Sequence, residues 1–480
     1  MKDTLFDLIN SLTRSEKRYF KLFASRHTIG EENNYVTLFN YIEKQSNYSE
    51  DSIFQKFSGE NFLNNFSITK KRLYNNILSA LDSFHLGNSE EAQLLRQIHA
   101  AEILIGKSLH EQAKKIILSV EKQAIKREYS LIIQKIFRLK NNYYREFGMD
   151  QNELKNLHVN YSKLEDLQSN ELVYLQLSKA LSMLKIDPEH FAELPSCQLI
   201  CTTENQLLFN HIELLKATKQ SHFSNAEIYY NINKQLFLEH LDLTINYFGL
   251  QMEMYRNGFN NALAQGKLND ATSILSEITL AEGGNEHHRA NCVMHREISE
   301  IDLAIYELNY DRLAQLVVAN KQLNSTNQGN TLVHVQNELI LKIAIAHLFL
   351  NKNNEGLLII NHYLQHNDQD YDAEMTSIAL VLDCVFHFEL KHHDYLKYAV
   401  KNTTRYLKSR NQYNNVNKSV LSLLLKLPNT NKIDQEELYQ EYYNKLANLK
   451  DAHPLLVINF NRYLTHKLKQ LHHSEAQKIN

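Results

Sequence analysis

Apolar and polar residues alternate along the chain with the spacing of helices. In residues 11–23 polar side chains surround an apolar stripe, which predicts one amphipathic helix. Further helices are expected near 35–45, 50–57 and 67–84, and Leu86-Gly87-Asn88 ends this first group. Short loops of Asn, Asp, Ser, Lys and His separate the segments that follow. The pattern predicts helix after helix.

Composition supports this pattern, because the 480 residues include only 4 Pro and 12 Gly. A chain of average composition would hold roughly 5% Pro and 7% Gly. Both residues interrupt helices, Pro through a ring clash and a missing N–H, and Gly through excess backbone freedom. Tight turns between strands need Gly, so the scarcity argues against all-β and α/β folds. We therefore expect an all-α protein.

A turn followed by a new helix recurs in the second half of the chain. The clearest copy is Gly266–Leu275, where Ala271 stands at the position where two helices must approach closely. Five copies place a small or apolar anchor at Ala226, Ala271, Ala314, Gly356 and Leu396. The steps of 45, 43, 42 and 40 residues each hold two helices with their turns. An earlier copy, Gly106–Ala113, has two extra residues before its Ala.

These segments resemble the turn between the paired helices of tetratricopeptide-type (TPR) repeats, where a Gly-Lys-aromatic-acidic-acidic-Ala run is typical. The resemblance extends over about 90–427, although the period exceeds the usual 34 residues. It implies a helical-hairpin, TPR-like, right-handed α-solenoid whose concave surface binds a partner protein. The family's peptide-binding residues have no counterparts here position by position.

Three parts are expected along the chain. Residues 1–88 form an N-terminal helical module, in which Thr13 and Glu16 make a capping box. Residues 89–430 carry the TPR-like repeats. Residues 431–480 form a C-terminal helical cap, which a stacked array needs to cover its last apolar face.

Charge and cysteine content exclude several classes of protein. The formal net charge of −3 excludes a uniformly basic nucleic-acid binder, although residues 1–145 carry about +6. Four Cys in a chain of this length are no disulfide framework. The first residues are no signal peptide, and the longest apolar stretch, Leu339–Leu350, is too short to span a bilayer. We expect a cytoplasmic protein that has no membrane partner.

Two stripes of cations are candidate partner-binding sites. The first consists of Lys135, Arg138, Asn142 and Arg145, and the second of Lys397, Lys401 and Arg405, continued by Lys408. Spacings of three and four residues put each stripe on one helix face, where it could pair with carboxylates or phosphates. The alternative is an ordinary solvated face.

Residues 50–84 could instead form a helix-turn-helix that contacts DNA. Lys70, Lys71 and Arg72 stand near the start of the second helix, where a recognition helix carries its phosphate-binding cations. The connection Ser58–Phe66 exceeds the usual tight turn, and an ordinary hairpin with a solvated basic end is the simpler interpretation.

No motif for chemistry is present. His362 and His366 share a helix face and precede Asp370 and Glu374, but a polar loop interrupts the register, and we expect no metal. Gly-rich phosphate loops and nucleophile elbows are absent, so no cofactor and no enzyme activity are expected. The sequence predicts a non-enzymatic scaffold that binds a protein or peptide, with an acidic ligand favoured. The alternative is a transcription regulator whose N-terminal module binds DNA.

Overall fold

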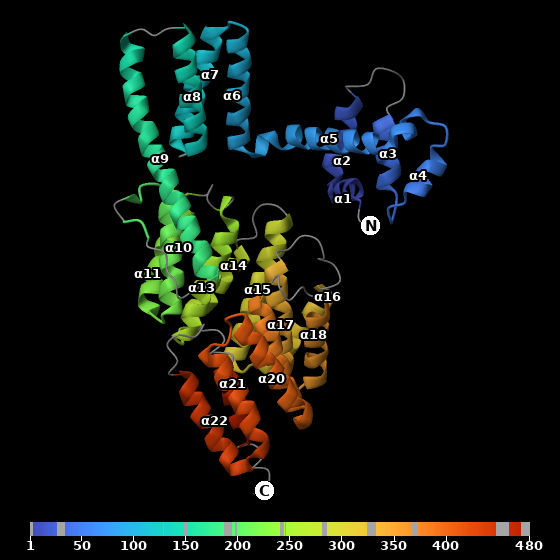
Figure 1. Ribbon diagram of the computed structural model, residues 1–480, viewed down its shortest axis with the longest axis vertical. Coiled ribbons are helices and arrows are strands. Elements are labelled where there is room, and N and C mark those ends of the chain that lie inside the picture. The colour runs from blue at the N-terminus through green and yellow to red at the C-terminus, as the bar shows by residue number, and fades with distance from the viewer. Residues whose placement is uncertain are drawn as a thin grey trace. The chain divides into compact units, whose positions relative to one another are not determined.

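The chain is all-α, as the sequence predicts. The computed structural model describes residues 3–25, 34–127, 129–147, 151–186, 194–196, 199–240, 244, 246–280, 286–323, 333–366, 373–447 and 460–471. Every regular element in these ranges is a helix, and none of them is a strand (Figure 1). None of the described helices has the length and apolar content needed to cross a bilayer.

Two compact units, Met1–Glu171 and Leu172–Asn480, divide the chain. We call them unit 1 and unit 2. The division falls within α9 (Gln151–Ile186). The three-part division at 88 and 430 stays a prediction.

Unit 1 contains two separate apolar cores. Its helices are α1 (Thr4–Ser11), α2 (Arg14–Ser25), α3 (Asn34–Glu43), α4 (Glu50–Lys56), α5 (Phe66–His85), α6 (Glu90–Gly106), α7 (His110–Lys126) and α8 (Ser130–Phe147), with the first part of α9. Helices α1 to α5 surround a core that includes Phe20, Phe39 and Leu73. Helices α6 to α8 enclose a second core that includes Ile98 and Phe137. The first core therefore belongs to the N-terminal part of the unit alone.

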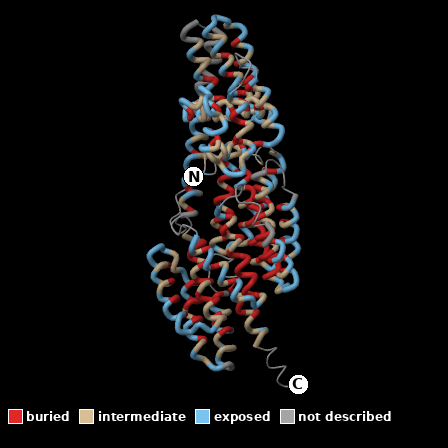
Figure 2. The backbone as a smooth tube through the Cα atoms, turned by 90° about the vertical axis from the view of Figure 1, so that its right-hand side faces the viewer, coloured by how far each residue is buried: buried red, intermediate tan, exposed pale blue. Residues whose placement is uncertain are grey.

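Unit 2 is built from paired helices in two layers. The inner layer consists of α10 (Thr203–Lys219), α13 (Phe248–Ala264), α15 (Glu286–Glu307), α17 (Val333–Phe349), α19 (Ala373–Glu389) and α21 (Asn415–Lys426), which contact one another in this order. Their outer partners are α11 (Phe223–Glu239), α14 (Leu268–Leu280), α16 (Tyr310–Leu323), α18 (Asn353–His366), α20 (His393–Ser409) and α22 (Lys432–Ala447). Figure 2 shows the buried residues gathered in the middle of this unit.

Six turns between paired helices share one backbone geometry. In each turn one residue adopts a left-handed conformation, with φ between 55° and 71°. The next residue donates its N–H to the carbonyl five positions earlier at 2.8 or 2.9 Å, the Schellman arrangement that ends many helices. The left-handed residues are Ser108, Ser221, Gly266, Leu308, Asn351 and Lys391. The turn is thus defined by backbone hydrogen bonds and accepts several side chains.

The fifth residue after each left-handed residue is a buried contact point. These residues are Ala113, Ala226, Ala271, Leu313, Gly356 and Leu396. The predicted anchor Ala314 is wrong by one position, because counting from Leu308 reaches Leu313, which is 0% exposed. The insertion of two residues predicted before Ala113 is also wrong. That spacing was counted from Gly106, whereas the left-handed residue of this turn is Ser108, which lies five positions before Ala113 as in the other turns.

Residues 460–471 form a further helix, which lies beside three of these turns in unit 2. Its contacts are Arg462 over the ring of Tyr306, His466 with Tyr310, Lys467 with Glu389, and Gln470 with Asn351. Each partner lies at or near a turn between an inner and an outer helix. This helix therefore packs along the row of hairpins, while α22 packs against α21.

Replacing Gly356 by Ala is expected to destabilise unit 2. A Cβ at this position would lie 2.3 Å from the ring of Phe386, which is 0% exposed and cannot swing into solvent. We expect the free energy of unfolding to fall by about 1–3 kcal/mol, the usual cost of overpacking. Urea denaturation would measure it. Gly106→Ala is the control, since nothing lies within 4 Å of its Cβ. Equal losses in both variants would contradict the packing argument.

Candidate partner-binding surface

Helix α20 presents its predicted cations to solvent. Its buried side is formed by Leu396, Ala399, Val400, Thr403 and Leu407. Lys397, Lys401, Arg405 and Lys408 lie on the other side and are all exposed. The guanidinium of Arg405 donates to the amide oxygen of Asn402, three residues earlier on the same helix, at 3.5 Å. Among the described residues, no carboxylate lies within ion-pair distance of these four cations.

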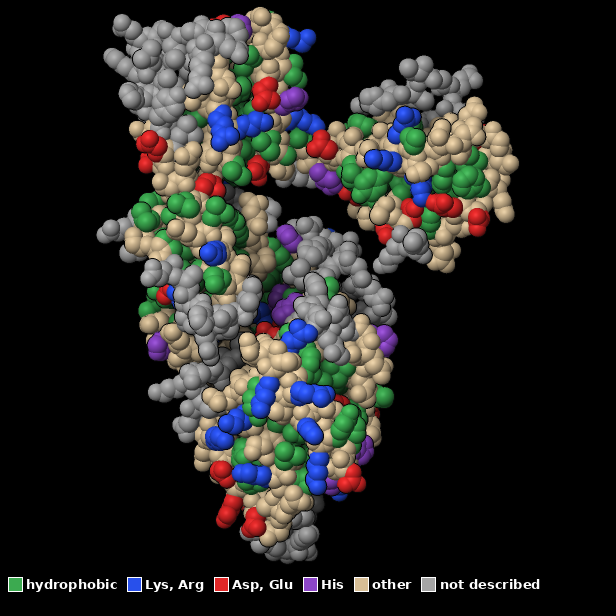
Figure 3. All heavy atoms as spheres, viewed as in Figure 1, with side chains coloured by type: hydrophobic (Ala, Val, Ile, Leu, Met, Phe, Trp, Pro, Cys, Tyr) green, Lys and Arg blue, Asp and Glu red, His purple; other side chains and the backbone are tan. Residues whose placement is uncertain are grey.

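Positive charge is concentrated in this part of the sequence. Residues 391–430 hold eight Lys or Arg and one Asp, although the whole chain carries −3. Figure 3 shows Lys and Arg side chains gathered over the part of unit 2 that contains α20 to α22. A field of one sign attracts ligands of the opposite sign and raises their rate of association.

Two tyrosines add apolar surface beside the cations. Tyr395 is 48% exposed and Tyr398 is 62% exposed, with ring centroids 6.1 Å apart. Exposed aromatic rings are rigid contact groups and are frequent at binding hot spots. We define the α20 surface as Lys397, Tyr398, Lys401, Arg405 and Lys408. Its cations cover about 16 Å along the helix at 1.5 Å per residue, which suits an extended ligand with several anionic groups.

The α8 stripe is also exposed where the structure describes it. Lys135, Arg138 and Asn142 face solvent, and the ammonium of Lys135 lies 3.7 Å from the carboxylate of Glu102. The opposite face buries Ile132, Ile133, Ile136 and Phe137. The side chain of Arg145 lies outside the described residues. This stripe presents fewer unpaired cations than α20.

The three cations predicted for DNA contact do not share one environment. Lys71 and Arg72 are exposed. Lys70 instead binds the carboxylates of Asp3 at 2.7 Å and Glu50 at 2.5 Å. Burial opposes the charge of Lys70, but these bonds raise its pKa well above its usual range. Lys70 therefore joins α1, α4 and α5 within the module.

Unit 2 contains a network of buried charges that was not predicted from the sequence. Arg256 on α13 donates to Ser299 of α15 at 2.8 Å and to Glu338 of α17 at 2.7 Å. Lys342 on α17 donates to Asp302 of α15 at 2.5 Å, and Asp302 also lies 3.5 Å from Arg256. Two cations and two carboxylates thus balance where water is largely excluded. The i, i+4 spacing of Glu338 and Lys342 was the only signal in the sequence.

Burial and the neighbouring charges shift the ionisation of this region. Burial opposes ionisation of Glu338, but Arg256 and Lys342 hold its pKa at about 2. Burial, with a contribution from Arg256, lowers the pKa of the adjacent His295 to about 4. At neutral pH His295 is therefore neutral and Glu338 is ionised. A set of groups whose charges already satisfy one another is suited to holding helices together rather than to binding an ion.

No protein-family model, curated protein or solved structure matches this chain. Within the described ranges, no three His, Cys, Asp or Glu side chains stand where they could share a metal ion. The rings of His362 and His366 stack at 4.2 Å, while Asp370 lies outside the described residues.

Removing one carboxylate from the buried charge network is expected to lower the free energy of unfolding. Asp302→Ala would leave the buried Lys342 without the carboxylate that it binds, while Arg256 would keep only Glu338. We therefore expect a loss of about 3–5 kcal/mol in unfolding free energy. Urea denaturation of the purified chain would measure this loss. Glu227→Ala is the control, because the Glu227–Lys267 pair is similarly short at 2.6 Å but exposed. The control should cost less than about 1 kcal/mol.

Mild acid is expected to destabilise the protein in part through His295. The pKa of His295 is about 4 in the folded chain, against the ordinary His value of 6.5, so the unfolded chain takes up the proton first as the pH falls. This stability is complete above pH 6.5 and falls as the pH drops towards 4, by about 2 kcal/mol at pH 5. Arg256, His334, Glu253 and Glu338 are the charged or titratable groups around it. His295→Gln should show a smaller loss between pH 7.5 and 5 in urea denaturation. An unchanged loss would contradict this assignment.

Proposed function

We propose that this chain is a non-enzymatic scaffold that binds an acidic protein or peptide through the α20 surface. The observation that carries the proposal is the row of four exposed cations on α20 with no carboxylate partner among the described residues. Unpaired cations next to exposed tyrosines provide both charge attraction and rigid contact area. The α8 stripe would be a secondary contact.

We propose further that unit 2 is a TPR-like, right-handed α-solenoid. Support comes from five turns of one geometry in this unit, from the buried residue five positions after each left-handed residue, and from inner helices that contact one another in chain order. Such an array exposes a long surface for its size, because each hairpin is covered only by its neighbours. A scaffold of this kind would act in the cytoplasm and needs no cofactor.

Charge reversal on α20 tests the proposed function. Three baits would be compared in lysate of the source cell. They are the full-length wild type, the α20 variant Lys401→Glu/Arg405→Glu, and the control variant Lys122→Glu/Lys126→Glu. Lys122 and Lys126 are exposed on α7 with the same spacing, so the control makes an equal charge change elsewhere. We expect proteins retained by the wild type and the control to be lost from the α20 variant, by roughly tenfold or more.

Half of each lysate would be treated with nuclease. Retention of the same proteins after this treatment supports a direct protein contact. Equal retention by all three baits would refute the role of the α20 surface. Proteins recovered only from untreated lysate, together with DNA, would favour the regulator instead, and Lys71 and Arg72 would then be tested in its place.

A further inference from the structure

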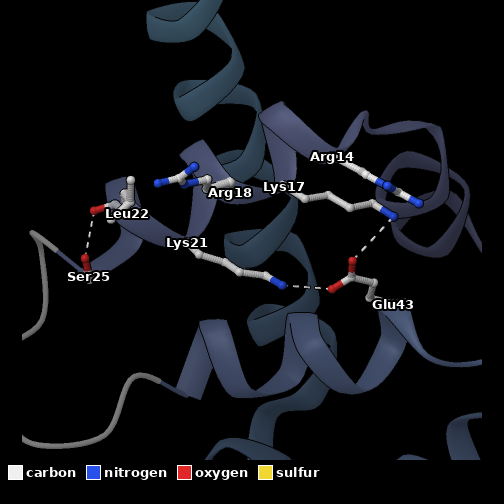
Figure 4. Close-up of a pocket in the computed structure, with 7 residues that line it drawn as sticks. All are labelled: Arg14, Lys17, Arg18, Lys21, Leu22, Ser25 and Glu43. Carbon is white, nitrogen blue, oxygen red and sulfur yellow. Dashed lines mark hydrogen bonds and ion pairs between the residues drawn. The ribbon is translucent and has the colours of Figure 1, made fainter.

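A shallow groove between α2 and α3 of unit 1 gathers four cations. Its lining consists of Arg14, Lys17, Arg18, Lys21, Leu22, Ser25 and Glu43 (Figure 4). The groove has a volume of about 630 Å³, within the size range of ligand sites. Four positive charges face one negative charge, so the groove favours an anion.

The helix that carries these cations is held firmly in place. Thr13 caps α2, since its N–H donates to the carboxylate of Glu16 at 2.7 Å and its hydroxyl accepts from the Glu16 N–H at 3.3 Å. Glu16 also lies 2.6 Å from the ring of His85 on α5. Phe20 and Ala24 are buried on the core side. The negative charge of Glu16 is thus used in holding α2, away from the groove.

Glu43 at the end of α3 organises two of the cations. Its carboxylate accepts from Lys21 at 2.9 Å and lies 3.5 Å from Lys17. Burial opposes its ionisation, but Lys21 and Lys17 lower its pKa. Arg14 and Arg18 have no hydrogen bond or ion pair with any described residue, and both are exposed. In Figure 4, Arg14 ends beside the ammonium of Lys17, and Arg18 extends towards Leu22.

The extent of the charge distinguishes between classes of ligand. The four cations lie within seven residue steps of one helix, about 10 Å. Helix α3 itself has no Lys or Arg, so all four cations that line the groove come from α2. Nucleic-acid surfaces usually contact many phosphates and continue over neighbouring elements. A compact group of high charge fits this groove better than a long polyanion does.

We propose that the α2–α3 groove binds a phosphorylated side chain of a protein partner. A phosphate monoester carries nearly two negative charges at neutral pH, and Arg binds it through two parallel N–H donors. Leu22, which is 57% exposed at the end of the groove near Arg18, would contact an apolar residue beside the phosphorylated one. This inference shares with the proposed function the premise of a protein partner, but it concerns a separate site on unit 1.

Binding to purified peptides tests the groove without relying on lysate. Full-length chain would be titrated into a fluorescent library of seven-residue peptides with phosphoserine fixed at the centre. The same library with serine is the first comparison. We expect binding of the phosphorylated library at least roughly tenfold tighter than that of the serine library, and weaker binding at high salt. Equal binding of the two libraries would refute the proposal.

Three variants separate the groove from a general charge effect. Arg14→Gln/Arg18→Gln should weaken phosphopeptide binding by roughly tenfold, because it removes the two unpaired donors. Glu43→Gln should strengthen binding by about two- to fivefold, because it removes a like charge, a gain that a misfolded chain would not show. Lys122→Gln/Lys126→Gln is the matched control on α7 and should stay within about twofold of the wild type. Equal losses in the control and the groove variant would refute the assignment.

Two competitors identify other ligands. Inorganic phosphate that binds as tightly as the peptides would refute a phosphopeptide site and indicate a free phosphate ligand. A 20-nucleotide single strand that displaces the peptides and loses affinity in the Arg14→Gln/Arg18→Gln variant would refute it in favour of nucleic acid. The α20 variant could retain the same lysate proteins as the wild type, which would refute the proposed function without changing these peptide results. The two proposals can therefore fail separately.

Discussion

The buried ion network of Arg256, Asp302, Glu338 and Lys342 is the constraint on which the middle of unit 2 depends. It joins α13, α15 and α17, and Arg256 and Glu338 are 82 residues apart in the chain. None of these helices can shift along its neighbours without separating a charged side chain from its partner. An unpaired charge in a dry interior costs several kcal/mol. Apolar contacts tolerate small sliding movements, whereas this network fixes the relative positions of three inner helices.

Pairing also separates the cations that hold the protein together from those that are available to a ligand. Lys70 and Lys342 each bind carboxylates from another helix, so their loss would disturb the fold. The cations of α20 and the two arginines of α2 have no such partner among the described residues. Positive charge in the sequence is therefore not evidence of binding by itself. Its environment decides which role it has.

The sequence predicted the fold class and the hairpin turns better than the sites. Scarce Pro and Gly were enough for the all-α prediction, and four of the five predicted anchors lie where the structure has them. Ala314 was misplaced because the left-handed residue there is Leu308, which carries no turn signature. Lys70 could not be recognised as a structural residue, because its partner Asp3 lies 67 positions away. The buried network was missed for the same reason, since helix packing brings its members together.

The helix of residues 460–471 bears on the order of events during synthesis. Its partners, from Tyr306 to Glu389, leave the ribosome before it does, and domains generally fold as they emerge. The side chain of Glu389 is only 9% exposed in the complete structure, where it binds Lys467. Lys467 is synthesised 78 residues after Glu389, so the carboxylate lacks this partner until then. The side of the three hairpins that this helix covers is therefore exposed until residues 460–471 have been synthesised. Completion of unit 2 therefore requires the synthesis of residues 460–471, even though most of its hairpins can form earlier.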